Sequence, residues 1–145
     1  MLKNVLWSFS AKDYADREEF NRAVAAYHDA IGPGEHRWQP AGLATAAPQL
    51  FICYEAWIRD KGDLAANERL LAAGSERENG LYNVEILALL RADDKKQGFS
   101  NLELLHKTHQ QMRGKDLDHH HFFAGYSPFL EDIDGLPAYK VRCGG

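Results

Sequence analysis

The chain has 145 residues, of which 45% are hydrophobic and 26% charged, and its 17 Lys and Arg stand against 21 Asp and Glu. This profile is typical of one soluble globular domain over residues 1–145, and such a domain buries about 70% of its unfolded surface without needing disulfides or a structural metal. The net charge of −4 is spread over both halves, which disfavours a nucleic-acid partner because phosphate binding needs clustered Lys and Arg. No apolar run approaches the roughly 20 residues of a membrane-spanning helix and the N-terminus has no signal-peptide core, so we expect a cytoplasmic protein without membrane contact.

The first third of the chain shows one strand pattern and one helix pattern. Alternating apolar residues predict a strand over residues 3–9. Asp16 is the expected N-cap of a helix over residues 16–31, where apolar residues recur at helical spacing. The Pro- and Gly-rich residues 32–49 are then expected to form a long connection, with a short edge strand near residues 36–39.

The middle of the chain contains the two most apolar segments. Residues 49–58 are apolar on both faces, which predicts a central strand, and residues 81–91 predict a second buried strand. Between them, the Ala- and Leu-rich residues 63–73 predict a short helix, and Asn79 with Gly80 marks a turn.

The C-terminal part of the chain begins with the clearest local signal. Ser100 opens a Ser-x-x-Glu capping box, which predicts a helix over residues 101–113. Two strands are expected after it, over residues 121–130 and 138–143, joined by a turn at residues 134–135.

The expected order of elements is strand, helix, strand, strand, helix, strand, with one further strand at the C-terminal end. This order matches the ferredoxin-like (split βαβ) topology of an α+β domain, in which two main helices cover one face of an antiparallel sheet of about five strands. That fold hosts many unrelated functions, so the function has to be sought in particular residues.

Most sequence motifs that carry a known chemistry are absent from the chain. It has no glycine-rich phosphate loop, dinucleotide fingerprint, nucleophile elbow or His-Glu-x-x-His pair. Cys53 and Cys143 lie outside any Cys-x-x-Cys pair, and each is expected to be a buried thiol. These absences favour a protein that binds a partner over the common hydrolase and nucleotide enzymes.

Histidine is concentrated in one stretch, with five of the seven histidines between residues 106 and 121. His106 and His109 are three apart on the predicted helix and share a face, and His119 and His121 point to one side of an extended segment. Together with Asp118, these side chains are candidate ligands for zinc or another divalent ion that holds a water for hydrolysis. In the alternative interpretation, the helix histidines pack in the core and the later ones lie at an exposed strand entry.

Aromatic and acidic residues form a second candidate site. A loop tryptophan, together with aromatic and acidic residues near the chain end, resembles the centre and rim of a protein-binding patch, where Trp and Tyr often dominate the affinity. In the alternative interpretation, the aromatic side chains close the ends of the core. The candidate contact residues are Trp38, Tyr126, Phe129, Glu131, Asp132 and Asp134.

The sequence therefore favours a small non-enzymatic protein-binding module, such as an adaptor, an antidote to a toxin or a regulator. Such a module needs no cofactor and binds another protein or a second copy of itself. The competing hypothesis is a metal-dependent hydrolase built on the histidines. A third hypothesis is a homo-oligomer that holds a small ligand in the groove between helices and sheet.

Overall fold

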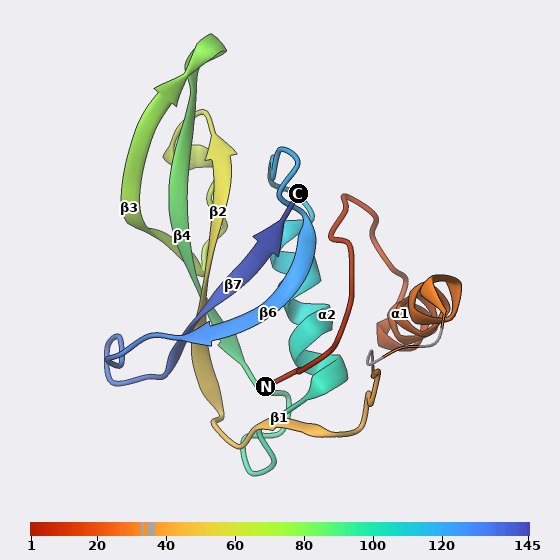
Figure 1. Cartoon of the computed structure of the whole chain (residues 1–145). Helices are drawn as coiled ribbons and strands as arrows, with labels where there is room; N and C mark the ends of the chain where they lie inside the picture. Colours follow the sequence, from red (N-terminus) through yellow and green to blue (C-terminus); the bar gives the residue numbers. More distant parts are fainter. Residues whose placement is uncertain (33, 35–36) are drawn as a thin grey trace.

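The structure is a computed structural model, and it describes residues 1–32, 34 and 37–145. Within these residues the chain is an α+β protein with two α-helices, one five-stranded sheet and one two-stranded sheet (Figure 1). The elements in chain order are α1 (Arg17–Ile31), β1 (Leu43–Thr45), β2 (Gln49–Ile58), β3 (Glu68–Arg77), β4 (Leu81–Arg91), β5 (Phe99–Ser100), α2 (Asn101–Met112), β6 (Phe122–Pro128) and β7 (Ala138–Gly144).

The five-stranded sheet has the order β3-β4-β2-β7-β6, and its strands pair antiparallel except for β2 and β7. These two run parallel, from Phe51 opposite Ala138 to Cys53 opposite Lys140. The sheet is therefore mixed, and its strand order differs from the antiparallel ferredoxin-like arrangement expected from the sequence. Beyond the short parallel contact, β2 continues beside β4 and β7 continues beside β6.

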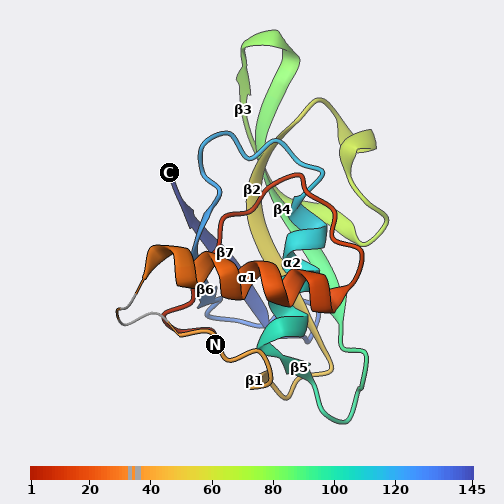
Figure 2. The same cartoon turned by 90° about the vertical axis from the view of Figure 1, so that its right-hand side faces the viewer.

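The helices are stacked in two layers on one side of the sheet. Helix α2 lies against the sheet, and α1 crosses α2 on the side that faces away from the sheet (Figure 1, Figure 2). Phe20 and Val24 of α1 are completely buried, as are Leu104 and Leu105 of α2. The sequence predicts that both helices cover the sheet, whereas α1 buries its one apolar stripe against α2 and the N-terminal segment.

Residues 3–9 do not form the predicted strand. Their odd-numbered apolar side chains are buried, as the pattern indicates, but the backbone makes only an isolated bridge to β6. Phe9 N–H donates to the His121 carbonyl at 2.8 Å, and Phe123 N–H donates to the Trp7 carbonyl at 2.8 Å. The alternation thus reflects one-sided burial along the sheet edge, which an extended segment achieves without joining a regular ladder.

Residues 63–73 do not form the predicted helix. The chain makes a single 3-10 turn at Lys61–Asp63 and then runs as β3, antiparallel to β4. Ala and Leu favour a helix locally, but pairing with β4 from Leu81 to Ala88 outweighs this weak propensity. Two register shifts interrupt β3, and such bulges make this outer strand a poor template for further pairing.

Most other local predictions are confirmed. Strands β2 and β4 have the predicted bounds. The predicted N-caps are present, because Asp16 Oδ1 accepts from Glu19 N–H at 2.8 Å and Ser100 Oγ accepts from Glu103 N–H at 3.0 Å. Of the edge strand expected near residues 36–39, the first residue lies outside the described residues and the other three form no strand.

Gly98→Ala is expected to lower the free energy of unfolding by about 1–3 kcal/mol, the usual size of a backbone strain. Gly98 has a φ of +76°, and a Cβ there would lie 2.2 Å from the carbonyl oxygen of Thr45. Urea denaturation measures the change. Gly114→Ala is the matched control, since a Cβ at Gly114 meets no atom within 4 Å. Equal losses in the two variants would contradict the expected strain.

Candidate functional site

His109 lies in the buried interior between α2, α1 and the N-terminal segment, where it is 1% exposed. Its Nδ1 accepts from Trp7 Nε1–H at 3.2 Å, and its Nε2 lies 2.9 Å from the Lys12 carbonyl oxygen, so Nε2 carries the proton. Burial lowers the pKa of His109 from its ordinary value, although the bond to Lys12 opposes this effect. Both ring nitrogens are engaged, so a metal could bind His109 only by breaking one of these bonds.

His106 lies one turn earlier on α2 and is also buried. Its ring stacks on Phe20 with the centroids 4.8 Å apart. Neither ring nitrogen has a hydrogen-bond partner among the described residues. Burial lowers the pKa of His106, and the nearby Arg17 guanidinium lowers it further. The neutral imidazole therefore behaves as a core side chain beneath the first turn of α1.

The three later histidines lie in the loop between α2 and β6. His121 Nδ1 is 2.9 Å from Ser8 Oγ, His119 Nδ1 is 3.2 Å from Asp118 Oδ1, and the His120 ring packs edge-on against His119. Within the part of the chain that the structure describes, no three His, Cys, Asp or Glu side chains group as a metal site would need. The zinc site thus stays a prediction without geometric support.

Two aromatic residues predicted for a partner surface are fixed to the helices. Trp38 Nε1–H donates to Asn21 Oδ1 on α1 at 2.7 Å. The Tyr126 hydroxyl lies 2.8 Å from Thr108 Oγ1 on α2. Both rings are partly buried against the main core. This placement favours the alternative interpretation for these two residues, in which aromatic side chains close the ends of the core.

The other four predicted contact residues belong to the connection between β6 and β7. We call residues 129–136 of this connection the acidic hairpin. Ile133 and Leu136 exchange two backbone hydrogen bonds of 2.9 Å. Between them, Asp134 and Gly135 have φ values of +52° and +77°. Positive φ at both central residues is the requirement of the type I′ turn that Asp-Gly favours. The turn expected at this position is confirmed.

Apolar side chains hold the acidic hairpin against the outer face of the sheet, which is the face turned away from α2. The odd-numbered residues of β2 point to this face, because the even-numbered ones pack into the main core with α2. Phe129, Ile133 and Leu136 of the hairpin pack on a small buried cluster there. The cluster consists of Phe51, Cys53, Leu87 and Ala138.

The tip of the acidic hairpin is open to solvent. Leu130 is 105% exposed, and the next two residues, Glu131 and Asp132, are exposed as well. Neither carboxylate has an ion pair within the described residues. Asp134, by contrast, lies 2.8 Å from Arg69 of β3. The hairpin therefore presents one apolar side chain and two unpaired negative charges.

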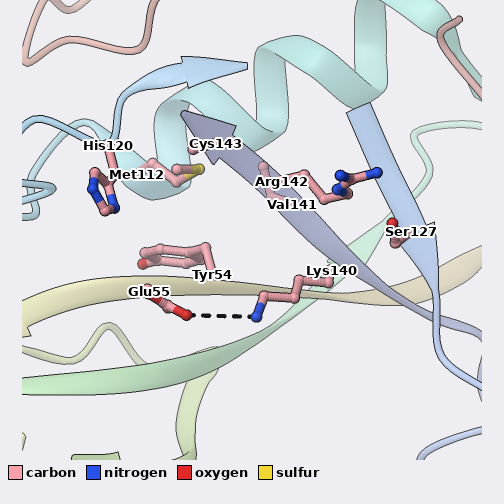
Figure 3. Close-up of a pocket in the computed structure, with 9 residues that line it drawn as sticks. All are labelled: Tyr54, Glu55, Met112, His120, Ser127, Lys140, Val141, Arg142 and Cys143. Carbon is pink, nitrogen blue, oxygen red and sulfur yellow. Dashed lines mark hydrogen bonds and ion pairs between the residues drawn. The ribbon is translucent and has the colours of Figure 1, made fainter. Parts of the chain in front are cut away.

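A cavity of about 320 Å³ opens between β2 and β7 where the two strands separate (Figure 3). We call it the sheet cleft. Strands β2 and β7 form its two walls, the end of α2 and the following loop lie at one end, and β6 contributes at the other. Its lining includes Tyr54, Glu55, His120, Lys140, Arg142 and Cys143.

The charges of the sheet cleft suit binding better than covalent chemistry. Lys140 lies 3.5 Å from both Glu55 and Glu85, which are opposite each other on β2 and β4. Burial alone would lower the pKa of Lys140, but the two carboxylates raise it above its ordinary value. Burial, followed by Glu55, raises the pKa of the Cys143 thiol to about 12. The thiol is therefore protonated at neutral pH and is a poor nucleophile.

A buried polar network beside α2 has no counterpart in the sequence patterns. The Glu68 side chain is completely buried, and its carboxylate accepts from the Tyr54 hydroxyl at 2.5 Å and from Gln111 Nε2 at 2.7 Å. Ala65 N–H donates to it at 2.6 Å, and Lys115 Nζ lies 2.9 Å away. These groups come from distant parts of the chain, so no local spacing could indicate the network.

Within the described residues, neither helix is long and apolar enough to cross a membrane. No protein-family model, curated protein or solved structure matches the chain.

Proposed function

We propose that the chain is a protein-binding module whose contact site is the acidic hairpin, and that its partner presents a basic surface around a small apolar pocket. The observation that most supports this proposal is the full exposure of Leu130 beside the unpaired carboxylates of Glu131 and Asp132. Burying a leucine side chain is worth about 1.5–3 kcal/mol, so a partner pocket that covers Leu130 gains a substantial contact.

The rigidity of the acidic hairpin supports this proposal. The hydrogen bonds between Ile133 and Leu136 close the turn, and Phe129 packs on the outer face of the sheet. The residues on both sides of the tip are therefore fixed before any partner arrives. Pre-organised contacts lose little conformational entropy on binding, which increases the affinity obtained from a small surface.

The charges of the tip indicate which surfaces it would select. Asp134 is paired with Arg69, so the charges open to a partner are those of Glu131 and Asp132. The chain as a whole carries a net charge of −4. Attraction between these charges and a basic surface accelerates encounter, weakens as salt is added, and disfavours acidic partners.

Leu130→Ala is expected to weaken binding of the partner at least about tenfold while leaving the melting temperature unchanged, because the side chain touches nothing in the free protein. A photo-crosslinking residue at position 130 first identifies the partner in extract, and titration of the purified partner then measures Kd. The matched control is Leu43, which is 65% exposed on β1, tested both with the crosslinker and as Leu43→Ala.

A second variant tests the electrostatic part of the proposal. Reversing both tip charges, as Glu131→Lys with Asp132→Lys, should slow association and reduce its dependence on salt. Unchanged affinity of Leu130→Ala would contradict the proposal, as would capture of the same proteins from positions 130 and 43.

A further inference from the structure

The sheet cleft lies where two neighbouring strands of the sheet separate. Strands β2 and β7 pair for only a few residues, ending at Cys53 opposite Lys140. Strand β2 then continues to Ile58 beside β4, and β7 continues to Gly144 beside β6. Each strand therefore turns one backbone edge toward the cleft while its other edge stays paired (Figure 3).

The backbone groups on the β2 wall follow from its hydrogen bonds on either side of the cleft. Phe51 N–H donates to the Pro137 carbonyl at 2.9 Å, and Trp57 N–H donates to the Asp116 carbonyl at 2.8 Å. Alternate residues of a strand direct their N–H and C=O groups to the same edge. Glu55 lies between these two donors, so its N–H and C=O face the cleft.

The same reasoning identifies the groups on the β7 wall. The carbonyl of Ala138 accepts from Phe129 N–H on the side of β6. Even-numbered residues of β7 therefore direct their backbone groups to β6. The odd-numbered residues Val141 and Cys143 direct theirs to β2 and the cleft. Val141 N–H is used by the last pair, because the parallel pair of Cys53 with Lys140 bonds Cys53 to the residues on either side of Lys140, so the Val141 carbonyl and both backbone groups of Cys143 face the cleft. Both walls thus offer hydrogen-bonding groups at the spacing of a β-strand.

The length of the sheet cleft limits what can enter it. The pairing of Cys53 with Lys140 closes one end, and the bridge between Trp57 and Asp116 closes the other. The stretch of β2 between these points spans about 13 Å, which is room for about three extended residues. The volume of about 320 Å³ is at the lower end of small-ligand sites, which run from about 300 to 1,000 Å³. A continuous strand cannot pass through, but a chain end can enter.

The charges of the cleft favour a carboxylate. Its lining has two cations, Lys140 and Arg142, and one carboxylate, that of Glu55, in a chain whose net charge is −4. Lys140 already lies near Glu55 and Glu85. Arg142 is exposed and has no ion pair within the described residues. An arginine without a partner is suited to bind a carboxylate with two parallel hydrogen bonds.

We propose that the sheet cleft binds the free C-terminal end of another polypeptide, about three residues long and extended between β2 and β7. The backbone groups of Glu55 and Cys143 and the carbonyl of Val141 pair with the peptide, and Arg142 binds its terminal carboxylate. The cleft is distinct from the acidic hairpin, which precedes Ala138, whereas the cleft follows Lys140. Either proposal can therefore fail without the other.

The test is an NMR titration of the isotope-labelled full chain with acetyl-trialanine, as the free acid and as the C-terminal amide. The free acid should produce saturable shifts at the amide signals of Glu55 and Cys143, and the amide should bind at least about tenfold more weakly. Arg142→Gln should reduce the affinity for the free acid to that for the amide. Arg91→Gln makes the same charge change on an exposed residue of β4 outside the cleft, and should have no effect.

Filling the cavity gives an independent readout. Cys143→Phe should abolish the shifts at Glu55, with the melting temperature confirming that the variant is folded. The absence of saturable shifts at Glu55 and Cys143 up to about 10 mM, for free-acid tripeptides with varied last residues, would overturn the proposal. Equal affinity for acid and amide would overturn the assignment to a C-terminus, and so would shifts confined to the acidic hairpin.

Discussion

Glu68→Ala is expected to lower the free energy of unfolding by about 3–5 kcal/mol, because it removes one partner of a buried ion pair. The Glu68 side chain is completely buried and that of Lys115 is only 9% exposed, with Nζ and the carboxylate 2.9 Å apart. Without the carboxylate, the ammonium loses its counter-charge. The Tyr54 hydroxyl and the Gln111 amide also lose an acceptor. Urea denaturation monitored by circular dichroism measures the loss.

The matched control is Glu76→Ala, which removes an exposed glutamate from the same strand and should cost less than about 0.5 kcal/mol. Adding Lys115→Met to Glu68→Ala should recover part of the loss, since it removes the uncompensated ammonium. Equal small losses in Glu68→Ala and Glu76→Ala would show that the buried pair does not stabilise the fold.

We also expect the Glu68 carboxylate to make the stability of the fold sensitive to strong acid. Burial by itself would raise the pKa of Glu68, but the hydrogen bonds from Tyr54, Ala65, Gln111 and Lys115 outweigh it and hold the pKa below its ordinary value. The carboxylate therefore stabilises the fold fully above its unfolded pKa of about 4.3, and this contribution is lost as the pH falls through the lower pKa of the folded state. In Glu68→Gln this part of the acid dependence should be absent.

His109→Leu is expected to lower the free energy of unfolding by about 2–4 kcal/mol, because two buried polar groups lose their partners. The Trp7 indole N–H loses its acceptor and the Lys12 carbonyl loses its donor. Leucine fills much of the space but can replace neither hydrogen bond. The matched control is His120→Leu on the exposed loop, which should change the stability little. If both variants cost the same, the hydrogen bonds of His109 contribute nothing.

We expect the buried histidines His106 and His109 to make the fold less stable in mild acid. Burial lowers the pKa of both His106 and His109, and the guanidinium groups of Arg17 and Arg113 act in the same direction while Asp13 opposes them. A histidine whose pKa falls on folding stabilises the fold fully above its unfolded pKa of about 6.5, and the contribution declines as the pH falls below that value towards the pKa of the folded state.

Urea denaturation between about pH 7 and about pH 5 separates this effect from that of Glu68, which titrates in stronger acid. The wild-type chain should lose stability across this range, and His109→Leu should lose less. A flat wild-type profile would contradict the neutral, buried state of both histidines.

Local signals predicted the elements that depend on a few neighbouring residues. The capping side chains of Asp16 and Ser100 mark the beginnings of both helices, and Asp134 with Gly135 marks the turn of the acidic hairpin. These predictions hold because caps and turns are hydrogen bonds and dihedral preferences within four or five residues. The bounds of β2 and β4 were also predicted, because both strands are apolar over most of their length.

The predictions that the structure contradicts concern segments whose conformation depends on strands far away in the sequence. Residues 63–73 have the composition of a helix but pair with β4, and residues 3–9 have the pattern of a strand but lie along a sheet edge with one isolated bridge. In both cases the outcome depended on which edge of the sheet was available. Residues 63–73 pair with the outer edge of β4, and residues 3–9 lie beside β6 at the opposite end of the sheet, and no local pattern encodes either position.

The candidate sites also combine features that local sequence predicted with contacts that it could not predict. The sequence placed His106 and His109 on one helical face, and it grouped the residues of the acidic hairpin, because both groups are local. It could not show that His109 is held by Trp7 and Lys12, or that the loop histidines lie apart from a metal geometry. Those neighbours come from segments up to about a hundred residues away.

By itself the sequence determined the α+β class, the two capped helices, the two central strands and the Asp-Gly turn of the acidic hairpin, since periodicity and capping are properties of short segments. The strand predicted over residues 121–130 is shorter, because β6 ends at Pro128 and Leu130 belongs to the exposed tip. Only the tertiary structure decided the mixed strand order, the stacking of α1 on α2, the buried network at Glu68 and the sheet cleft. Each of these depends on contacts between segments far apart in the chain, and such contacts are selected by the burial and hydrogen bonding of the whole fold.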